Sequence, residues 1–426
     1  MISSKIAETY RQILKEELQE ATGCTEPIAL ALAGAKAREV LGDLPDQADV
    51  YCSGNIIKNV KAVVVPNSGG IKGIDTAVVL GMTAGDASVG LQVISNVKEE
   101  QKKELKDHLK QIDVTCHLAV NVPTLYIRIE ARKGNDSVLV EIQQTHSNFT
   151  RIERNGEVLL AKECTEEESV GADKSLMNVK DILEYAETVD LDDVKEVIER
   201  QIRDNTAICE EGLKNSWGEE VGKTLMDHLQ SCDVRTRARA KAAAGSDARM
   251  NGCPMAVVIN SGSGNQGMTV SLPVIEYARE LNVSHEKLIR ALVLANLIAL
   301  HQKRYIGYLS AYCGAVSAAT GAGCGICWLK GGSYEQICQV ITNSIAVIGG
   351  MVCDGAKSSC AGKISIAIET ALQAVDMAFN GHVYRSGEGM VKGDIEKTIE
   401  AYGRMAAKGM KETDIEILNI MLEESC

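Results

Sequence analysis

Apolar side chains recur at helical spacing at the start of this chain and predict two helices there. Over residues 3–20, the apolar positions are spaced as on one face of a helix, with Lys and Glu between them. Gly23 ends this helix, and a second helix is predicted from Thr25 to Val40. Thr25 would cap the second helix, and Pro27 falls in its first turn, where proline is well tolerated.

The pattern changes between residues 48 and 165, where runs of β-branched residues predict strands. These runs cover residues 62–66, 114–122, 124–130 and 137–143. The last three follow one another closely, which predicts a β-meander. Helical patterns at 74–84 and 97–111 lie between the runs. The whole stretch is therefore predicted to form a compact α+β region.

A helical pattern returns after the acidic segment 164–169 and continues almost to the end of the chain. Apolar periodicity with glycine-rich breaks predicts helices near residues 177–188, 191–204, 218–231, 266–282, 284–303, 333–350, 361–379 and 393–407. The predicted fold class is α+β, with N-terminal helices and a small α+β domain followed by a mainly α-helical C-terminal domain. The predicted domain boundaries are 1–46, 47–168 and 169–426.

Composition and charge exclude some classes of binding partner. The 426 residues include 45 Lys and Arg against 58 Asp and Glu, a formal net charge of −13. Nucleic acids and anionic membranes bind clustered basic residues, so neither is a predicted partner. The one dense basic run, 235–241, is interpreted as an exposed helix face. The start has no apolar secretory segment and the apolar windows are too short to span a membrane, so a soluble cytoplasmic protein is expected.

Fourteen cysteines are unusual in such a chain, and six of them lie close together among glycines: Cys313, Cys324, Cys327, Cys338, Cys353 and Cys360. A disulfide framework is expected in short secreted chains, which this chain does not resemble. Clustered cysteines in a reducing compartment are either ligands of a soft metal or cluster, or small buried hydrophobes at a helix interface. Their spacing matches neither ferredoxins nor zinc ribbons, so spacing alone leaves both interpretations open.

Cys24 is a second candidate, within the segment Gly-Cys-Thr-Glu-Pro at 23–27. It directly precedes a predicted helix, and the positive end of a helix dipole lowers the pKa of a thiol. Such a thiol is a candidate base or nucleophile. The alternative is an ordinary capping turn in which Cys24 only packs.

Two Asn-Ser-Gly loops, 67–70 and 260–264, each lead into a predicted helix and offer free backbone N–H groups. Such groups suit a carboxylate or a phosphate, although neither loop has the ending of a P-loop. The alternative for each is a tight turn capped by Asn or Ser. His301 lies on an apolar helix and is assigned no role. No lysine lies in a recognisable pyridoxal-phosphate context, so that cofactor is not expected.

Five segments, taken together and in their order along the chain, resemble the L-cysteine desulfidase family. That family is itself similar to the alpha chain of iron–sulfur L-serine dehydratases. The resemblance runs nearly end to end. It rests on Gly-Cys-Thr-Glu-Pro at 23–27, Pro-Asn-Ser-Gly-Gly at 66–70, Asn-Ser-Gly-Ser-Gly at 260–264, the loop from Cys313 to Cys324, and Val-Cys-Asp-Gly-Ala-Lys-Ser-Ser-Cys at 352–360. The last two segments are the most specific.

The resemblance implies a [4Fe–4S] cluster in the 169–426 domain, held by three cysteines and leaving one iron free for substrate. The implied ligands are Cys313, Cys353 and Cys360. Cys324 and Cys327 would then be neighbours of the cluster, although Cys324 or Cys426 could act as an extra ligand. The resemblance also implies that Cys24 is the catalytic base, at a position where the dehydratases have histidine.

The implied reaction is β-elimination of L-cysteine to pyruvate, ammonia and hydrogen sulfide. Cys24 would remove the Cα proton, and the open iron would act as a Lewis acid for the leaving group. The substrate carboxylate would be held by the two loops, through Asn67, Ser68, Asn260 and Ser261. An iron–sulfur L-serine dehydratase is the alternative, because the two substrates differ by one atom. A non-catalytic metal or cluster protein is a further alternative, and the family is compatible with a homodimer.

Overall fold

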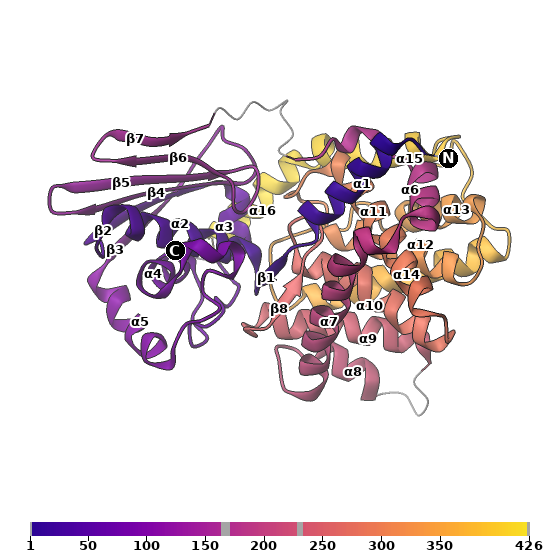
Figure 1. The fold of residues 1–426 in the computed structure, drawn as a ribbon, viewed down its shortest axis with the longest axis horizontal. Coiled ribbons are helices and arrows are strands. Elements are labelled where there is room, and N and C mark those ends of the chain that lie inside the picture. The colour runs from indigo at the N-terminus through magenta and orange to yellow at the C-terminus, as the bar shows by residue number, and fades with distance from the viewer. Residues whose placement is uncertain (1, 163–170, 228–232, 424–426) are drawn as a thin grey trace.

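The computed structural model describes residues 2–162, 171–227 and 233–423, and it has the predicted α+β class. Figure 1 shows a sheet half on one side and a larger helical half on the other. Among the described residues, no helix is both long enough and apolar enough to cross a membrane.

The elements of the sheet half and the segment before it are α1 (Ser4–Glu17), β1 (Glu20–Thr22), α2 (Thr25–Leu41), β2 (Gln47–Cys52), α3 (Gly54–Val60), α4 (Ile74–Ala84), η1 (Ala87–Gln92), α5 (Glu99–Gln111), β3 (Asp113–Leu118), β4 (Tyr126–Lys133), β5 (Asp136–Gln143), β6 (Phe149–Arg154) and β7 (Glu157–Ala161). The helical half follows with η2 (Lys174–Leu176), α6 (Val179–Thr188), α7 (Leu191–Lys214), α8 (Val221–Asp227), α9 (Val234–Met250), β8 (Ala256–Val258), α10 (Gly264–Glu280), α11 (His285–Ile306), α12 (Gly314–Leu329), α13 (Tyr334–Ile348), α14 (Cys360–Phe379), α15 (Ile395–Arg404) and α16 (Lys411–Glu423).

Six strands form one mixed sheet in the order β3-β2-β4-β5-β6-β7. β2 and β3 pair in parallel, and all other neighbours are antiparallel. Alternate residues of β4 and β5 are buried, as expected for strands with one covered face, and α2 packs on both strands. Since α4 packs on α2 in turn, α2 is buried along most of its length.

The helical half is centred on α11 and α12, whose residues are mostly buried. The basic run at 235–241 lies on α9. Its basic side chains are only partly exposed and form ion pairs, whereas an exposed helix face was expected. Arg235 and Arg239 pair with Glu369 of α14, and Lys241 pairs with Glu276 of α10. These ion pairs join α9 to its two neighbours.

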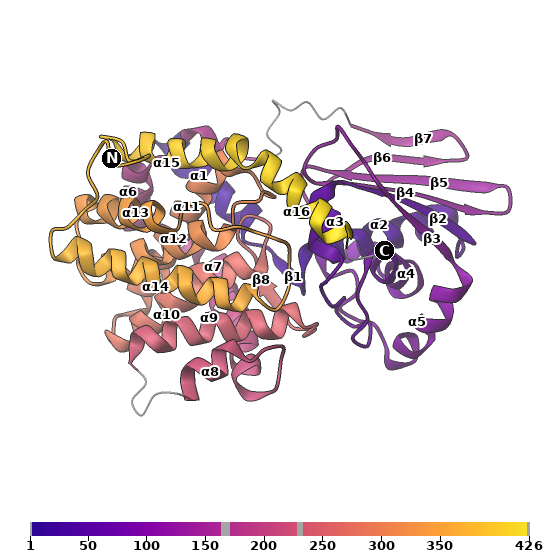
Figure 2. The ribbon, with the colours of Figure 1, turned by 180° about the vertical axis from the view of Figure 1, so that it is seen from behind.

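A two-stranded link connects the halves and positions the candidate site. β1 pairs antiparallel with β8, with Glu20 opposite Val258 and Thr22 opposite Ala256. In Figure 1 this pair lies between the sheet and the helices. The pairing places the turn before α2 beside the loop that leads into α10. Figure 2 shows that α16 crosses back from the helical half to α3, on which it packs.

Several local predictions differ from the structure. The strand predicted at 62–66 is wrong, because only Val64 forms an isolated bridge, to Lys72, while Val63 and Val65 are buried. A short apolar run cannot by itself distinguish a strand from a buried loop. The predicted meander is also wrong, because β2 lies between β3 and β4. The helix predicted at 218–231 corresponds to α8, Val221–Asp227. Residues 228–231 of that prediction lie outside the described residues, as does the acidic segment.

Helix α1 packs on α6, α7 and α11 of the helical half, whereas α2 packs on the sheet. The N-terminal segment 1–46 therefore contributes to both halves. The domain boundaries themselves stay a prediction.

Candidate active site

A small cavity of about 90 Å³ lies where the β1–β8 link meets the helical half. Its walls come from the start of α2, the end of α9, and the loops before α10, α12 and α14. The predicted site residues that line it are Cys24, Ser261, Cys313, Cys353 and Cys360. Tertiary packing thus brings the catalytic candidate and the candidate ligands to one place.

Backbone hydrogen bonds hold two of the candidate ligands side by side. The N–H of Cys313 donates to the carbonyl of Met351 at 2.8 Å, and the N–H of Cys353 donates to the carbonyl of Ala311 at 2.7 Å. The thiols of Cys313 and Cys353 are in hydrogen-bond contact. Cys313 caps α12 and Cys360 is the first residue of α14, so both lie at helix N-termini.

The surroundings of these thiols favour a thiolate at Cys353. The hydrogen bond from Cys313 lowers the pKa of Cys353 to about 6, and the nearby cations Lys58 and Lys363 contribute to the shift. The same hydrogen bond, together with burial, raises the pKa of Cys313. Burial raises the pKa of Cys360. One thiol of the three is therefore poised to ionise first.

This donor set fits an iron–sulfur cluster better than a single ion. In the described parts of the chain, no three His, Cys, Asp or Glu side chains are arranged around one metal ion. A cubic cluster binds each thiolate through a different iron, so the contacting thiols of Cys313 and Cys353 would have to separate to hold one. Helix N-termini and neighbouring lysines also suit the negative charge of such a group.

Cys24 caps the start of α2 and is only 2% exposed. Its Sγ donates a hydrogen bond to Oε2 of Glu26 at 3.1 Å. The expectation that the helix dipole lowers its pKa is wrong. Burial, followed by the charge of Glu26, raises the pKa of the Cys24 thiol well above its usual value.

Glu26, which the sequence reasoning left without a role, is the centre of a buried polar group at the cavity. Its Oε1 accepts a hydrogen bond from the amide of Asn59 at 3.1 Å and lies 3.7 Å from Nε2 of His146. Glu26 belongs to the Gly-Cys-Thr-Glu-Pro segment, so its position in that segment was an available signal. Asn59 and His146 carried no comparable signal, because they reach Glu26 from α3 and from the loop after β5.

Arg249 and Gln266 face the cavity, and the sequence reasoning missed both. Arg249 is 1% exposed, and its Nε donates to the carbonyl of Gly23 at 2.9 Å. One terminal nitrogen of Arg249 and the amide oxygen of Gln266 have no hydrogen-bond partner among the described residues. A Cβ at Gly264 would lie 2.4 Å from Nε of Arg249, and one at Gly314 would lie 2.4 Å from Cδ of Gln266. Glycine at both positions therefore makes room for these side chains.

The two Asn-Ser-Gly loops lie differently from the expected carboxylate clamp. Asn67 donates to the carbonyl of Ile94 at 2.8 Å, and the hydroxyl of buried Ser68 bonds to the backbone of Ile71. Asn260 is fully buried and donates to Oδ1 of Asn296 at 2.9 Å. Of the four loop residues predicted to bind substrate, the cavity is lined by Ser261 and not by Asn67, Ser68 or Asn260.

The first loop packs against the turn that carries Cys24 instead of facing the cavity. A Cβ on Gly23 would lie 1.9 Å from Cγ of Pro66, so Pro66 packs directly against the turn that carries Cys24. Gly23 also has a φ of +69°, a conformation that glycine adopts without strain.

The other clustered cysteines lie away from the cavity. Cys324 and Cys327 are buried within α12 and do not line it. At the rise of an α-helix, Cys324 is about 16 Å further along the axis than Cys313. Cys426 lies outside the described residues.

Comparison with known proteins places these features in a family. The sequence-family model described as the serine dehydratase alpha chain matches residues 88–419 of this chain. The matched residues include Arg249 and all three candidate ligands but not Cys24. A UPF0597 protein of Lachnoclostridium phytofermentans is 51% identical over 96% of this chain and 98% of its own. UPF0597 proteins of Fusobacterium nucleatum and Treponema denticola are 47% and 45% identical over 97% and 98% of this chain, and over 98% of their own.

Proposed function

We propose, since the chain belongs to the serine dehydratase alpha chain family, that it is an amino-acid lyase that acts on L-cysteine. The products would be pyruvate, ammonia and hydrogen sulfide. The observation that carries this proposal is the position of Cys24. Its thiol lines the same small cavity as Cys313, Cys353 and Cys360, although these residues come from distant parts of the sequence.

In this proposal Cys313, Cys353 and Cys360 hold a [4Fe–4S] cluster. Such a cluster with one open iron supplies a Lewis acid that stabilises the departing sulfide. Soft sulfur is a good ligand for iron of this kind, which favours L-cysteine as the substrate.

The chain's own residues would bind and deprotonate the amino acid. Arg249 offers a buried N–H group for the α-carboxylate, and the amide oxygen of Gln266 suits the ammonium group. These two side chains, with Ser261, take over the role expected of Asn67 and the other loop residues. Cys24 in its thiolate form removes the Cα proton, which starts the elimination.

L-Serine is the second candidate substrate, and the family match is the observation that favours it. The matched family model is described as a serine dehydratase alpha chain. Serine presents the same carboxylate and ammonium groups as cysteine and has a hydroxyl as the leaving group. The grip proposed for Arg249 and Gln266 therefore serves both amino acids.

The deciding experiment is anaerobic reconstitution of the chain with iron and sulfide, followed by parallel assays with L-cysteine and L-serine. Pyruvate and sulfide from cysteine, with little pyruvate from serine, is the expected result. A preference for serine would make the protein a dehydratase with a thiol base. Bound iron without any product would identify a non-catalytic cluster protein.

Variants separate the base from the ligands. Cys24→Ala should retain iron and its visible absorbance but lose turnover, because only the base is removed. Cys313→Ser should lose both iron and turnover. Cys324→Ala, which removes a buried thiol that does not line the cavity, is the matched control and should retain both. Loss of iron from Cys24→Ala would instead make Cys24 a ligand.

A further inference from the structure

The proposed elimination leaves a proton on Cys24 that must depart before the next turnover. Each catalytic cycle moves the Cα proton of the substrate to Sγ of Cys24. That thiol is 2% exposed and packs in one buried cluster with Val63 and Met250, so it has little direct access to bulk water. The structure therefore has to offer another route for the proton.

Glu26 lies between Cys24 and a buried imidazole. Its Oε2 accepts the hydrogen bond of Cys24 at 3.1 Å, while its Oε1 faces Nε2 of His146 at 3.7 Å. Asn59 donates to the same Oε1 at 3.1 Å and Thr25 lies 3.2 Å from Oε2, so both oxygens are held in place. The carboxylate thus presents one oxygen to the thiol and the other to the imidazole.

His146 lies between the catalytic cavity and a second cavity. The second cavity has a volume of about 260 Å³, and its lining includes His146, Thr145, Gln19 and Ser147. Gln19 and Ser147 are exposed, so this cavity reaches the surface. His146 is only 5% exposed, and its Nε2 has no hydrogen-bond partner among the described residues.

The position of the imidazole depends on a glycine. A Cβ at Gly262 would lie 2.9 Å from Cε1 of His146, so the ring packs against the backbone of the loop before α10. This loop also accepts a hydrogen bond from the hydroxyl of Thr25 at 2.7 Å, through the carbonyl of Gly262. The same loop therefore positions both His146 and the start of α2.

We propose that Glu26 and His146 form the proton path that returns Cys24 to its thiolate form. The S–H bond of Cys24 breaks as Glu26 Oε2 takes the proton, and Glu26 gives a proton from its carboxyl group to Nε2 of His146. The imidazolium then releases a proton from Nδ1 to water in the second cavity, and proton exchange with that water restores the Nδ1–H tautomer. No oxidant or reductant takes part, and the net result is a thiolate at Cys24 and a proton in solvent. Glu26 and His146 act through Cys24 and are therefore positioning residues.

The pKa values along this path place the resting proton on Cys24, so Glu26 carries it only in passing. Glu26 stays ionised despite its burial, because the nearby imidazole of His146 and the hydrogen bond from Cys24 hold its pKa low, at about 2. The positive charge of Arg249 favours the thiolate of Cys24, although burial and the charge of Glu26 outweigh it.

The test combines chemical rescue with a measurement that needs no cluster. In His146→Ala, kcat should fall about 100-fold, the usual contribution of a positioned acid–base group, while KM changes little. Alkylation of Cys24 by iodoacetamide in the cluster-free chain, followed by peptide mass spectrometry, should also slow. Added imidazole should partly restore both rates, because it can enter the space of the lost ring from the second cavity.

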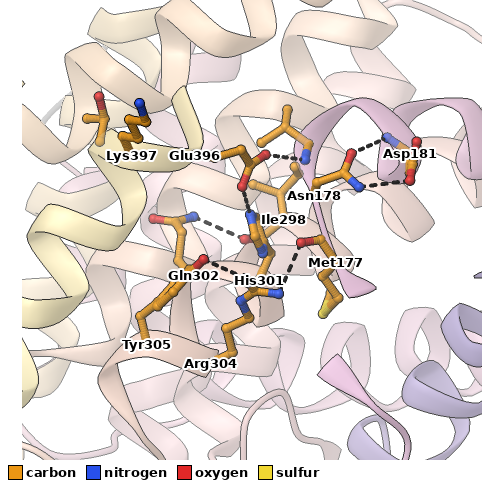
Figure 3. A network of polar contacts seen from close by, with 12 residues as sticks. Met177, Asn178, Asp181, Ile298, His301, Gln302, Arg304, Tyr305, Glu396 and Lys397 are labelled. Carbon is orange, nitrogen blue, oxygen red and sulfur yellow. Dashed lines mark hydrogen bonds and ion pairs between the residues drawn. The ribbon is translucent and has the colours of Figure 1, made fainter. Parts of the chain in front are cut away.

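His301→Ala is the matched control, because His301 is another buried histidine paired with a carboxylate. Its Nε2 lies 2.6 Å from Oε2 of Glu396, away from the cavity, in the network that Figure 3 shows. In this variant the rate of Cys24 alkylation should equal that of the parent chain, and added imidazole should not change it. Glu26→Gln keeps the side-chain shape but cannot carry the proton. Turnover and Cys24 alkylation should both be slow in this variant, and added imidazole should restore neither rate.

The outcomes also separate this path from the proposed lyase activity on which it rests. A folded His146→Ala that alkylates at the parent rate, or that imidazole does not restore, would overturn the path. If the parent chain makes no pyruvate but His146→Ala still slows the alkylation, the lyase proposal fails and the path stands. Should His146→Ala not fold, Glu26→Gln decides: unchanged Cys24 reactivity there overturns the path.

Discussion

At the scale of single residues, Arg249 combines full burial with an N–H group that has no partner among the described residues. We expect Arg249→Lys to raise KM for the amino acid about 10- to 100-fold, the range of a lost hydrogen bond to a charged group. Lysine cannot reproduce the planar fork or the bond to the carbonyl of Gly23. Steady-state kinetics of the iron-loaded enzyme measure this change.

The control for this prediction lies on the same helix. Arg239→Lys changes an arginine that pairs with Glu369 away from the cavity, and it should leave KM within about 2-fold because this partly exposed pair does not touch the substrate site. Equal KM values for the parent and Arg249→Lys would remove Arg249 from the substrate site.

Glu26 also makes stability depend on pH. The nearby imidazole of His146 and the hydrogen bond from Cys24 lower the pKa of Glu26 in the folded state from the usual 4.5 to about 2. The folded chain therefore binds this proton less readily than the unfolded chain, and the stabilisation is complete above pH 4.5 and is lost as the pH falls toward 2. Urea unfolding at pH 6 and pH 3 should show a smaller pH-dependent loss in Glu26→Gln than in the parent; equal losses would contradict this assignment.

Only some of the candidate site residues could be predicted from the sequence. Cys24, Cys313, Cys353 and Cys360 could be selected because their segments resemble a known family. Arg249 and His146 could not, because nothing local distinguishes a buried arginine at a helix end, or a histidine in a hairpin loop, from an exposed one. The pKa of Cys24 was misjudged for the same reason, since burial is a tertiary property.

At the scale of elements, α2 and α4 meet backbone to backbone, which holds in place the helix that Cys24 caps. A Cβ at Gly81 would lie 2.1 Å from the carbonyl oxygen of Ala31, and one at Gly34 would lie 2.6 Å from that of Val78. Gly81→Ala should lower the free energy of unfolding by about 1–3 kcal/mol, the usual cost of overpacking. Urea unfolding followed by circular dichroism checks this value.

Gly362→Ala provides the comparison, because Gly362 lies within α14 and a Cβ there would meet nothing within 4 Å. Alanine is the better helix former, so this variant should be stabilised by up to about 1 kcal/mol. If both alanines had the same effect, the close approach of α2 and α4 would not be the cause.

Helices were easier to predict than strands in this chain, for a physical reason. Periodicity indicated α2, α4 and α5 because each has a continuous local pattern. β2 was missed, and its insertion between β3 and β4 makes the predicted meander wrong. Pairing between strands depends on contacts between distant segments, which local patterns do not contain.

At the scale of the whole molecule, a buried ion pair joins the sheet half to the C-terminal helix. Lys58 of α3 is 1% exposed, pairs with Asp414 of α16, and donates to the carbonyl of Cys353 at 3.3 Å. Asn55 donates to the same Asp414 at 2.7 Å. Asp414→Ala should lower the free energy of unfolding by about 3 kcal/mol, because it leaves a buried ammonium without its partner.

The double variant Lys58→Met/Asp414→Leu isolates the cause. It removes both charges and keeps apolar volume, so it should recover much of the stability lost in Asp414→Ala. Chemical unfolding of the two variants side by side measures the difference. A double variant no more stable than Asp414→Ala would show that the buried charge is not the cause.

The sequence by itself determined the α+β class, the positions of most helices, and the cysteine segments that resemble a known family, because these depend on local composition and spacing. The tertiary structure alone decided which polar groups surround Cys24. The β1–β8 pairing brings Arg249 and Gln266 to the cavity, and packing of α2 on the sheet brings His146 to Glu26. These groups come from distant parts of the chain, and both their contacts and their burial arise only when the two halves fold together.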